Sequence, residues 1–297
     1  MVPDKPAAEV DIDERLVRTL LQGQAPELAA LELRPIAAGW DNSVWRLGAQ
    51  HAVRLPRRAV AAPLVENEQR TLPEIARRLS DVDVAVPAPL VAGRPAAGYP
   101  WAWSVVPWIG GDAGLRVPRP QRSGWAAVLA DALGALHAPA APGYPVNPVR
   151  GVPLAARAAA VAGRFASLGR AHDGLDVLER DWRAALHAPV WGGPPLWIHG
   201  DLHPGNLVAR GGQLTGIIDF GDVTAGDPAY DLAVAWLAFD ADGRARFTDT
   251  ARGRYDSATW TRARGWAAAV TLLLLDGSDD NPEYRALGLE CLAELTT

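Results

Sequence analysis

The sequence predicts an α+β protein of two lobes, a small N-terminal lobe with an antiparallel sheet and a larger, mostly helical C-terminal lobe. Stretches with strand character fall before residue 107, at 33–36, 43–47, 52–55, 90–92 and 102–106. Segments with helical periodicity follow, at 124–137, 153–167, 175–187, 228–239, 257–275 and 283–295. The break lies in the Pro- and Gly-containing stretch 107–111, so we expect one lobe over 1–107 and the other over 108–297.

Four further elements complete the expected order. Helices are predicted over 11–30 and 63–79, and Pro73 is expected to start a new turn or to kink the second of them. Two strands, 196–199 and 214–219, interrupt the helices of the C-terminal lobe. These two strands immediately precede or include the most polar motifs of the chain.

Composition narrows the classes of function. The 297 residues carry a formal net charge of −5, whereas nucleic acid requires a basic face, so no nucleic-acid partner is expected. The single cysteine, Cys291, excludes a disulfide framework and a thiolate metal cluster. The N-terminus is polar and acidic, and the longest strongly apolar stretch, 266–275, is too short to cross a bilayer. We expect a cytoplasmic protein without a membrane partner and, since no hydrophobic stripe indicates a dimer seam, a monomer.

Two short segments concentrate the chemistry: HGDLHPGN at 199–206 and IIDFGD at 217–222. Both belong to short apolar strands and the turns after them, which places two carboxylates and an amide at strand ends. Mg²⁺ prefers oxygen ligands, usually one or two protein groups together with phosphate oxygens and water. Asn206 and Asp219 suit that role, and Asp201 remains to accept or orient a hydroxyl proton.

The spacing within these segments matches the protein-kinase signature. In H-R-D-L-x-x-x-N the catalytic Asp precedes the metal-binding Asn by five positions, as Asp201 precedes Asn206. Asp219 opens the triplet D-F-G, and a Gly in place of the Arg is the form found in antibiotic and metabolite kinases. WIHGDLHPGNLV, GIIDFGD and GDPAYDLA together closely resemble the aminoglycoside phosphotransferase family. A weaker resemblance extends from about residue 33 to the C-terminus.

The resemblance implies a protein-kinase-like fold, with a nucleotide-binding N-terminal lobe and a catalytic, acceptor-binding C-terminal lobe. It implies that Asp201 is the catalytic base or orients the acceptor hydroxyl. Asn206 and Asp219 would hold one or two Mg²⁺ ions against the phosphates of ATP or GTP. The implied reaction moves the γ-phosphoryl group to a hydroxyl, for which a protein supplies chiefly positioning and charge stabilisation.

The family also assigns roles in the N-terminal lobe. The loop 39–43 is where the family covers the nucleotide phosphates, and Ser43 is its candidate donor, although the loop also reads as an ordinary polar hairpin turn. The strand HAVRLP occupies the place of a lysine-bearing strand, and here it offers Arg54, which keeps the charge but changes the geometry of the phosphate contact. Its expected partner is Glu68, with Glu66 as the second choice; surface ion pairing is the alternative for both.

The stretch WSVVPW at 103–108 resembles the hinge that reads the edge of the nucleobase. Pro107 has no N–H and cannot donate to the base. The family pattern then favours the Val106 carbonyl and the Trp108 N–H as the hydrogen-bonding pair. An ordinary buried strand would look similar.

Several polar residues around the motifs have structural explanations. His199 is expected to pack and bond the catalytic loop, and Asp227, followed by proline, reads as a helix N-cap. By resemblance, Asp231 braces the catalytic loop by accepting backbone hydrogen bonds. His203 is placed near the acceptor, and Asp222 beside the metal site or the acceptor.

A polycationic aminoglycoside would require a carboxylate-lined groove. Asp222, Asp240, Asp280 and Glu283, together with His203, are the candidate acceptor-binding residues. Acidic surface loops are common, and the family also phosphorylates macrolides, peptide antibiotics and metabolites.

Three functions follow from these observations. The first is an antibiotic O-phosphotransferase, for example one acting on an aminoglycoside. The second is a metabolic kinase for an amino alcohol, a sugar or a homoserine-like acceptor. The third is a nucleotide-binding pseudokinase, for which Arg54 in place of lysine leaves room, while the presence of Asp201, Asn206 and Asp219 weighs against it.

Overall fold

The computed structural model describes residues 7–278 and 281–297. The chain divides into two compact units, one of Met1–Arg77 and Ala85–Gly110, the other of Arg78–Val84 and Gly111–Thr297. The first unit therefore ends at Gly110, whereas the sequence predicts a lobe boundary at residue 107.

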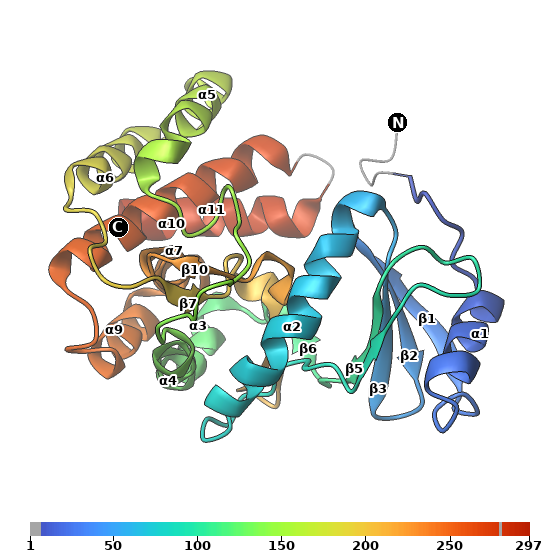
Figure 1. The fold of residues 1–297 in the computed structure, drawn as a ribbon. Helices are drawn as coiled ribbons and strands as arrows, with labels where there is room; N and C mark the ends of the chain where they lie inside the picture. The colour runs from blue at the N-terminus through green and yellow to red at the C-terminus, as the bar shows by residue number, and fades with distance from the viewer. Residues whose placement is uncertain (1–6, 279–280) are drawn as a thin grey trace. The chain divides into compact units, whose positions relative to one another are not determined.

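The first unit is built around a five-stranded antiparallel sheet in the order β1-β2-β3-β5-β4 (Figure 1). Consecutive hairpins form β1 to β3, and β5 inserts between β3 and β4. The elements of this unit are α1 (Glu14–Gln24), β1 (Leu33–Ala38), β2 (Asn42–Leu47), β3 (His51–Pro56), α2 (Ala62–Arg78), β4 (Val91–Gly93) and β5 (Trp103–Pro107).

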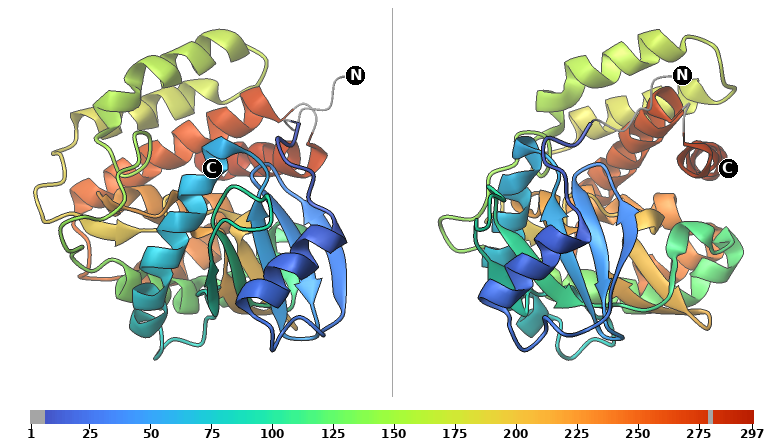
Figure 2. Two further views of the ribbon diagram at one scale, coloured as in Figure 1. Left: turned by 45° about the vertical axis from the view of Figure 1, so that its right-hand side comes forward. Right: turned by 90° about the vertical axis from the view of Figure 1, so that its right-hand side faces the viewer.

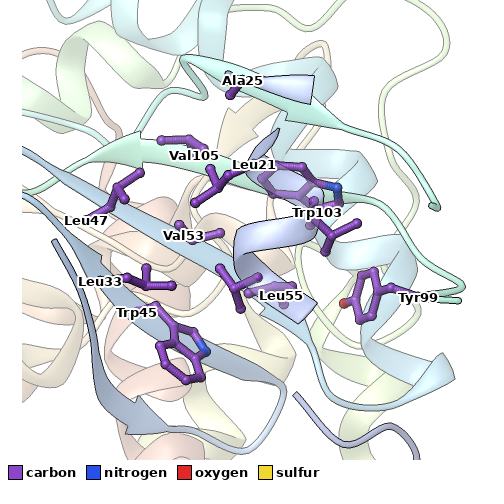
Figure 3. Packing of buried hydrophobic residues seen from close by; sticks show 12 residues of the cluster. Leu21, Ala25, Leu33, Trp45, Leu47, Val53, Leu55, Tyr99, Trp103 and Val105 are labelled. Atoms are coloured by element: carbon purple, nitrogen blue, oxygen red, sulfur yellow. The ribbon is translucent and has the colours of Figure 1, made fainter. Parts of the chain in front are cut away.

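One hydrophobic core joins α1 to the sheet (Figure 3). The helix begins at Asp13, whose side chain accepts a hydrogen bond from the Leu16 N–H at 2.7 Å. Leu20 and Leu21 are buried on one face of the helix and pack in the same cluster as Val53 of β3. Burying a side chain of this size stabilises the fold by roughly 1.5–3 kcal/mol, which explains why the helix docks on the sheet.

The pairing of β4 with β5 depends on the absence of a side chain at Gly93. A Cβ at this position would lie 2.2 Å from ring atom Cε2 of the fully buried Trp103, its partner across the ladder. We expect Gly93→Ala to lower the free energy of unfolding of the first unit by about 1–3 kcal/mol, because the buried indole has no room to move. Chemical denaturation of the purified protein measures this change.

Gly23→Ala is the matched control. Gly23 lies in α1, and a Cβ there would meet no heavy atom within 4 Å. Alanine favours helix over glycine by up to ~1 kcal/mol, so this variant should be as stable as the wild type or more stable. Equal stability of the Gly93→Ala and Gly23→Ala variants would contradict the packing at Gly93.

The helix α2 continues through Pro73 as one assigned helix over Ala62–Arg78. Of the two outcomes expected at Pro73, a new turn or a kink, the new turn is not present, because the helix is unbroken at this residue. Glu68 lies on its buried face together with Val65 and Leu72. The Glu68 carboxylate therefore points into the protein, and a buried carboxylate requires a cationic partner.

In the second unit the long helix α10 (Ser257–Gly277) packs against α6 (Leu175–His187) and α11 (Pro282–Thr296), as Figures 1 and 2 show. The rings of Trp182 and Trp266 meet edge to face between α6 and α10, with centroids 5.9 Å apart. The remaining helices of the second unit are α3 (Arg119–Arg122), α4 (Ala126–Leu136), α5 (Ala158–Leu168), α7 (Ala229–Leu232), α8 (Val234–Ala238) and α9 (Ala241–Thr250).

Two small antiparallel sheets position the polar loops of this unit. β7 (Leu196–Ile198) pairs with β10 (Thr224–Gly226), and β8 (Leu207–Arg210) pairs with β9 (Gln213–Ile217) and with β6 (Asp112–Ala113). The loops after β7 and β9 carry the two motifs singled out by the sequence. In the part of the chain that the structure describes, no helix combines the length and the apolar character needed to traverse a membrane.

Candidate active site

The loop that carries Asp201 follows β7 and turns sharply at Gly200. Gly200 has φ +84°, and a Cβ there would lie 2.4 Å from the Asp222 carbonyl oxygen. Both the left-handed backbone and the close approach of the two loops therefore require glycine. This turn brings Asp201 next to the residues that follow β9.

A buried carboxylate holds the loop from behind. Asp231, with no exposed surface, accepts hydrogen bonds from the His199 N–H (2.7 Å) and the Gly200 N–H (3.0 Å). His137 contacts the same carboxylate through Nε2 at 3.2 Å, and its Nδ1 lies 2.7 Å from the hydroxyl of Tyr255. The predicted bracing role of Asp231 is confirmed by these bonds.

His199 links the two motifs from inside the core. Its Nδ1 accepts the Asp201 N–H at 3.1 Å, so Nε2 carries the proton that bonds the Ile218 carbonyl at 2.9 Å. The ring also packs on Phe220, with centroids 4.4 Å apart. The expected structural role of His199 is confirmed.

The Asp201 carboxylate has three polar neighbours. Arg150 donates from Nη2 to Oδ1 at 3.0 Å, His203 Nε2 lies 3.6 Å from Oδ2, and Asn206 Nδ2 lies 3.4 Å from Oδ2. Burial opposes the charged form, but the hydrogen bond and charge of His203, and then the charge of Arg150, outweigh it and lower the pKa of Asp201 below its ordinary value. The carboxylate is therefore ionised at neutral pH and partly accessible, with 35% of the side chain exposed.

Asn206 and Asp219 stand at adjacent ends of the β8–β9 hairpin. The Ile218 N–H donates to the Asn206 carbonyl at 2.9 Å, directly before Asp219. The Asn206 Nδ2 donates to the Asp201 carbonyl at 2.8 Å, which orients the amide so that Oδ1 is the branch suited to ligation. Asp219 adopts a left-handed backbone (φ 64°), an uncommon conformation for a non-glycine residue and one that clusters at functional sites.

These oxygen donors fit Mg²⁺. Within residues 7–278 and 281–297, three or more His, Cys, Asp or Glu side chains nowhere gather into a metal site. In nucleotide enzymes Mg²⁺ takes one or two protein oxygens together with phosphate oxygens and water, and Asn206 and Asp219 carry oxygens of this kind.

The structure brings Arg150, which the sequence did not single out, into the centre of this site. Its guanidinium lies between Asp201 and Asp222, 3.6 Å from Asp222 Oδ2, donates to the Tyr230 hydroxyl, and lies over the ring of Tyr230. Asn147 Nδ2 donates to Asp222 Oδ1 at 2.7 Å. Burial raises the pKa of Asp222; the charges of Asp201 and Asp219 add to this rise, while Arg150 opposes it. Arg150 thus compensates two carboxylates of the site.

Of the other candidate acceptor residues, His203 lies at the site and Asp240 and Glu283 are engaged elsewhere. His203 packs edge to face on Tyr284, with centroids 5.4 Å apart. Asp240 caps α9 and accepts from Ser123 Oγ at 2.7 Å, while Glu283 forms an exposed ion pair with Arg116 at 3.1 Å. Asp280 lies outside the described residues.

In the first unit, the structure pairs Arg54 with Glu68. Arg54 Nη1 lies 2.8 Å from Glu68 Oε1, and the two side chains are only 12% and 4% exposed, whereas Glu66 is exposed. Ser43, at the start of β2, accepts a hydrogen bond from Trp45 Nε1 at 3.0 Å. The alternative of a surface ion pair therefore does not apply to Arg54 and Glu68.

The two proposed hinge residues take part in the sheet. The Trp108 N–H donates to the Gln50 carbonyl at 2.7 Å, and Val106 stands opposite Ala52 in the β3–β5 ladder. Arg46 lies over the Trp108 ring, 4.1 Å from its centroid. Donation from Trp108 to a nucleobase would therefore require the bond to Gln50 to open.

Comparisons with known proteins place this geometry in a family. The model of the phosphotransferase enzyme family matches residues 32–266. A homoserine kinase of Gluconacetobacter diazotrophicus is 33% identical over 196 residues, which cover 59% of this chain and 55% of that kinase. The match thus spans about half the length of this relative.

Solved structures share the fold. The GDP complex of aminoglycoside 2'-phosphotransferase-IIIa superposes with a TM-score of 0.67 at 21% identity, covering 96% of this chain and 99% of that one. The macrolide 2'-phosphotransferase MphH from Brachybacterium faecium gives a TM-score of 0.61 at 22% identity, covering 94% and 98%. The expected two-lobed, kinase-like α+β fold is confirmed. Because the family model matches most of the length of this chain, the chain belongs to the phosphotransferase enzyme family.

Proposed function

We propose that this protein uses Mg²⁺ and ATP or GTP to phosphorylate a hydroxyl group of a small molecule. The observation that carries the proposal is the joint placement of Asp201, Asn206 and Asp219 by one glycine turn and one hairpin. An ionised carboxylate stands beside two oxygen donors, as phosphoryl transfer requires.

Asp201 has the properties of the group that receives the acceptor hydroxyl. Its carboxylate is ionised and fixed in orientation by Arg150 and Asn206, so it can accept a hydrogen bond from the hydroxyl and take its proton. The acceptor oxygen bonds to the γ-phosphorus, and the bond from that phosphorus to the β,γ-bridging oxygen breaks, leaving the nucleoside diphosphate. Mg²⁺ held by Asn206 and Asp219 would neutralise phosphate charge.

The first unit supplies a cation for the nucleotide phosphates. Arg54 is paired with the buried Glu68, which fixes the position of the guanidinium group. Ser43, Val106 and Trp108 are the further nucleotide-binding residues that we propose in this unit.

Arg54→Gln is expected to weaken the binding of Mg-ADP about tenfold or more, because it removes a phosphate-binding charge and leaves Glu68 buried without that partner. Isothermal titration calorimetry with Mg-ADP measures the effect. Arg34→Gln, which removes an exposed guanidinium paired with Glu32 in the same unit, is the control. Wild-type affinity in the Arg54→Gln protein would remove Arg54 from the nucleotide site.

Two acceptor classes compete. A cationic acceptor such as an aminoglycoside would use Asp222 and His203, since Asp240 and Glu283 are engaged elsewhere. A metabolic acceptor is favoured by two observations: the relative matched over 196 residues is a homoserine kinase, and Arg150 compensates the carboxylates Asp201 and Asp222. We propose a small metabolite as the acceptor.

A panel of acceptors tests the proposal. The purified protein with Mg²⁺ and ATP or GTP is incubated with kanamycin, a macrolide, L-homoserine, 3-aminopropan-1-ol and a sugar, and nucleoside diphosphate release is measured. Release above that of Asp201→Asn identifies the acceptor class. Nucleotide binding without release above that background on any acceptor would indicate the pseudokinase instead.

A further inference from the structure

Among the residues that the structure describes, three arginines and no acidic residue line a crevice in the second unit. Arg150, Arg157 and Arg164 line it together with Tyr230, Trp266 and Leu273, and we call it the arginine crevice. Arg157, Val161 and Arg164 recur along α5 and the turn before it at helical spacing, so both arginines lie on the face that borders α10. Three cations therefore converge on one small space.

Two of these cations lack a counter-charge. Arg157 and Arg164 are half-buried, and among the described residues neither side chain has a hydrogen bond or an ion pair. Elsewhere in the second unit, half-buried or buried arginines are paired, as Arg262 is with Asp227 at 2.6 Å and Arg244 with Glu294 at 3.1 Å. Partly desolvated guanidinium groups without partners favour an anion from outside the chain.

Arg150 connects the arginine crevice to the candidate catalytic residue. Arg150, one of the residues that line the crevice, donates from Nη2 to Asp201 Oδ1 at 3.0 Å, and its Nε is buried without a hydrogen-bond partner in the described structure. The distance between an anionic group in the crevice and Asp201 is therefore no longer than one arginine side chain. A ligand that also places a hydroxyl at Asp201 must carry the two groups a few bonds apart.

We propose that the arginine crevice binds a carboxylate of the acceptor, so that the protein phosphorylates small hydroxy acids. This inference rests on the proposed phosphotransferase function and names its substrate class. The crevice measures about 40 Å³, against roughly 10–15 Å³ needed for one ordered water, so it has room for a group of the size of a carboxylate. Guanidinium groups bind carboxylates in paired hydrogen bonds, and a polycation would be repelled.

Matched acceptors test the proposal. L-homoserine and 3-aminopropan-1-ol differ only in the carboxylate, as do 4-hydroxybutanoate and propan-1-ol. Binding of each to the full-length protein is measured by isothermal titration calorimetry, both without nucleotide and with Mg-ADP, so that the result does not depend on turnover. The kcat/KM of phosphorylation is measured in parallel for the same four compounds.

The expected result is a preference for the carboxylate-bearing member of each pair of at least about tenfold in binding and in kcat/KM, as one charge-assisted pair of hydrogen bonds supplies. The double variant Arg157→Gln/Arg164→Gln should lose most of this preference while keeping its affinity for Mg-ADP. Arg170→Gln, an exposed arginine after α5, is the matched control and should keep the preference.

Two binding results, and one result with kanamycin, would overturn the inference. One is equal binding, or no binding, of both members of each pair by the wild type. The other is a preference that persists unchanged in Arg157→Gln/Arg164→Gln, since these side chains would then only cover the apolar surface of Val161 and Trp266. The inference also fails if kanamycin is phosphorylated with no effect of the double substitution.

The same measurements separate this inference from the proposed reaction. Carboxylate-selective binding that depends on Arg157 and Arg164, with no acceptor gaining a phosphoryl group, would support the arginine crevice and refute the phosphotransferase reaction. Phosphorylation of a neutral or cationic acceptor, insensitive to both arginines, would support the reaction and refute the arginine crevice.

Discussion

Asp201→Asn is expected to lower kcat by about 10²–10⁴-fold with the affinity for Mg-nucleotide unchanged. Asparagine keeps the size of the side chain and one oxygen toward Arg150, but it cannot take a proton from the acceptor hydroxyl. Nucleoside diphosphate release under saturating substrates measures kcat, and calorimetry with Mg-ADP measures affinity. A lower kcat with unchanged affinity for Mg-nucleotide is expected because Asp201 acts only in the chemical step.

Two further variants are compared with Asp201→Asn. Asp219→Asn should weaken Mg-nucleotide binding as well as kcat, because Asp219 is proposed as a metal ligand. Asp176→Asn removes an exposed carboxylate of α6, 3.8 Å from Arg180, and should leave both quantities at the wild-type values. Wild-type turnover of Asp201→Asn would show that another group orients the acceptor.

Asp231→Ala is expected to lower the free energy of unfolding of the second unit by roughly 3–5 kcal/mol. The substitution leaves the buried N–H groups of His199 and Gly200 without an acceptor and removes the partner of His137. Urea denaturation followed by circular dichroism measures the loss. The loop that carries Asp201 would also lose its tether, so kcat should fall in the fraction that remains folded.

The variant Asp231→Asn keeps the test informative if Asp231→Ala fails to fold. Its single carbonyl oxygen can accept one of the two loop N–H groups, so we expect a smaller destabilisation than with alanine. Asp249→Ala, which removes an exposed carboxylate paired with Arg252, is the control. Full stability of Asp231→Ala would contradict the bracing role derived from its hydrogen bonds.

Local spacing in the sequence accounts for how the candidate residues Asp201 and Asn206 come to lie side by side. The turn and the hairpin that position Asp201 and Asn206 are determined by residues close to them in the sequence. Gly200, for example, marks the turn between β7 and Asp201. The sequence predicted the boundaries of some helices and strands less well. The strand β8 was not predicted, because LVAR is a short run directly after a turn, and the predicted helix 228–239 divides into α7 and α8 at Ala233.

Contacts between distant parts of the chain could not be predicted where no family motif marks them. Arg150 lies 51 positions before Asp201 in a proline-rich loop, and no periodicity or spacing connects the two residues. The same holds for Asn147, which bonds Asp222 from 75 positions away. The engagement of the Trp108 N–H by Gln50 depends on the register of β3 against β5, which the hinge-like sequence does not fix.

Transfer of radiolabel from [γ-³²P]ATP to the acceptor tests the central claim most directly. The wild-type protein should move the label to one hydroxyl of a small molecule in the presence of Mg²⁺, with transfer lost on chelation by EDTA and reduced about 10²-fold or more by Asp201→Asn. Transfer that continues undiminished in EDTA, or equally in Asp201→Asn, would contradict a reaction centred on Asp201, Asn206 and Asp219.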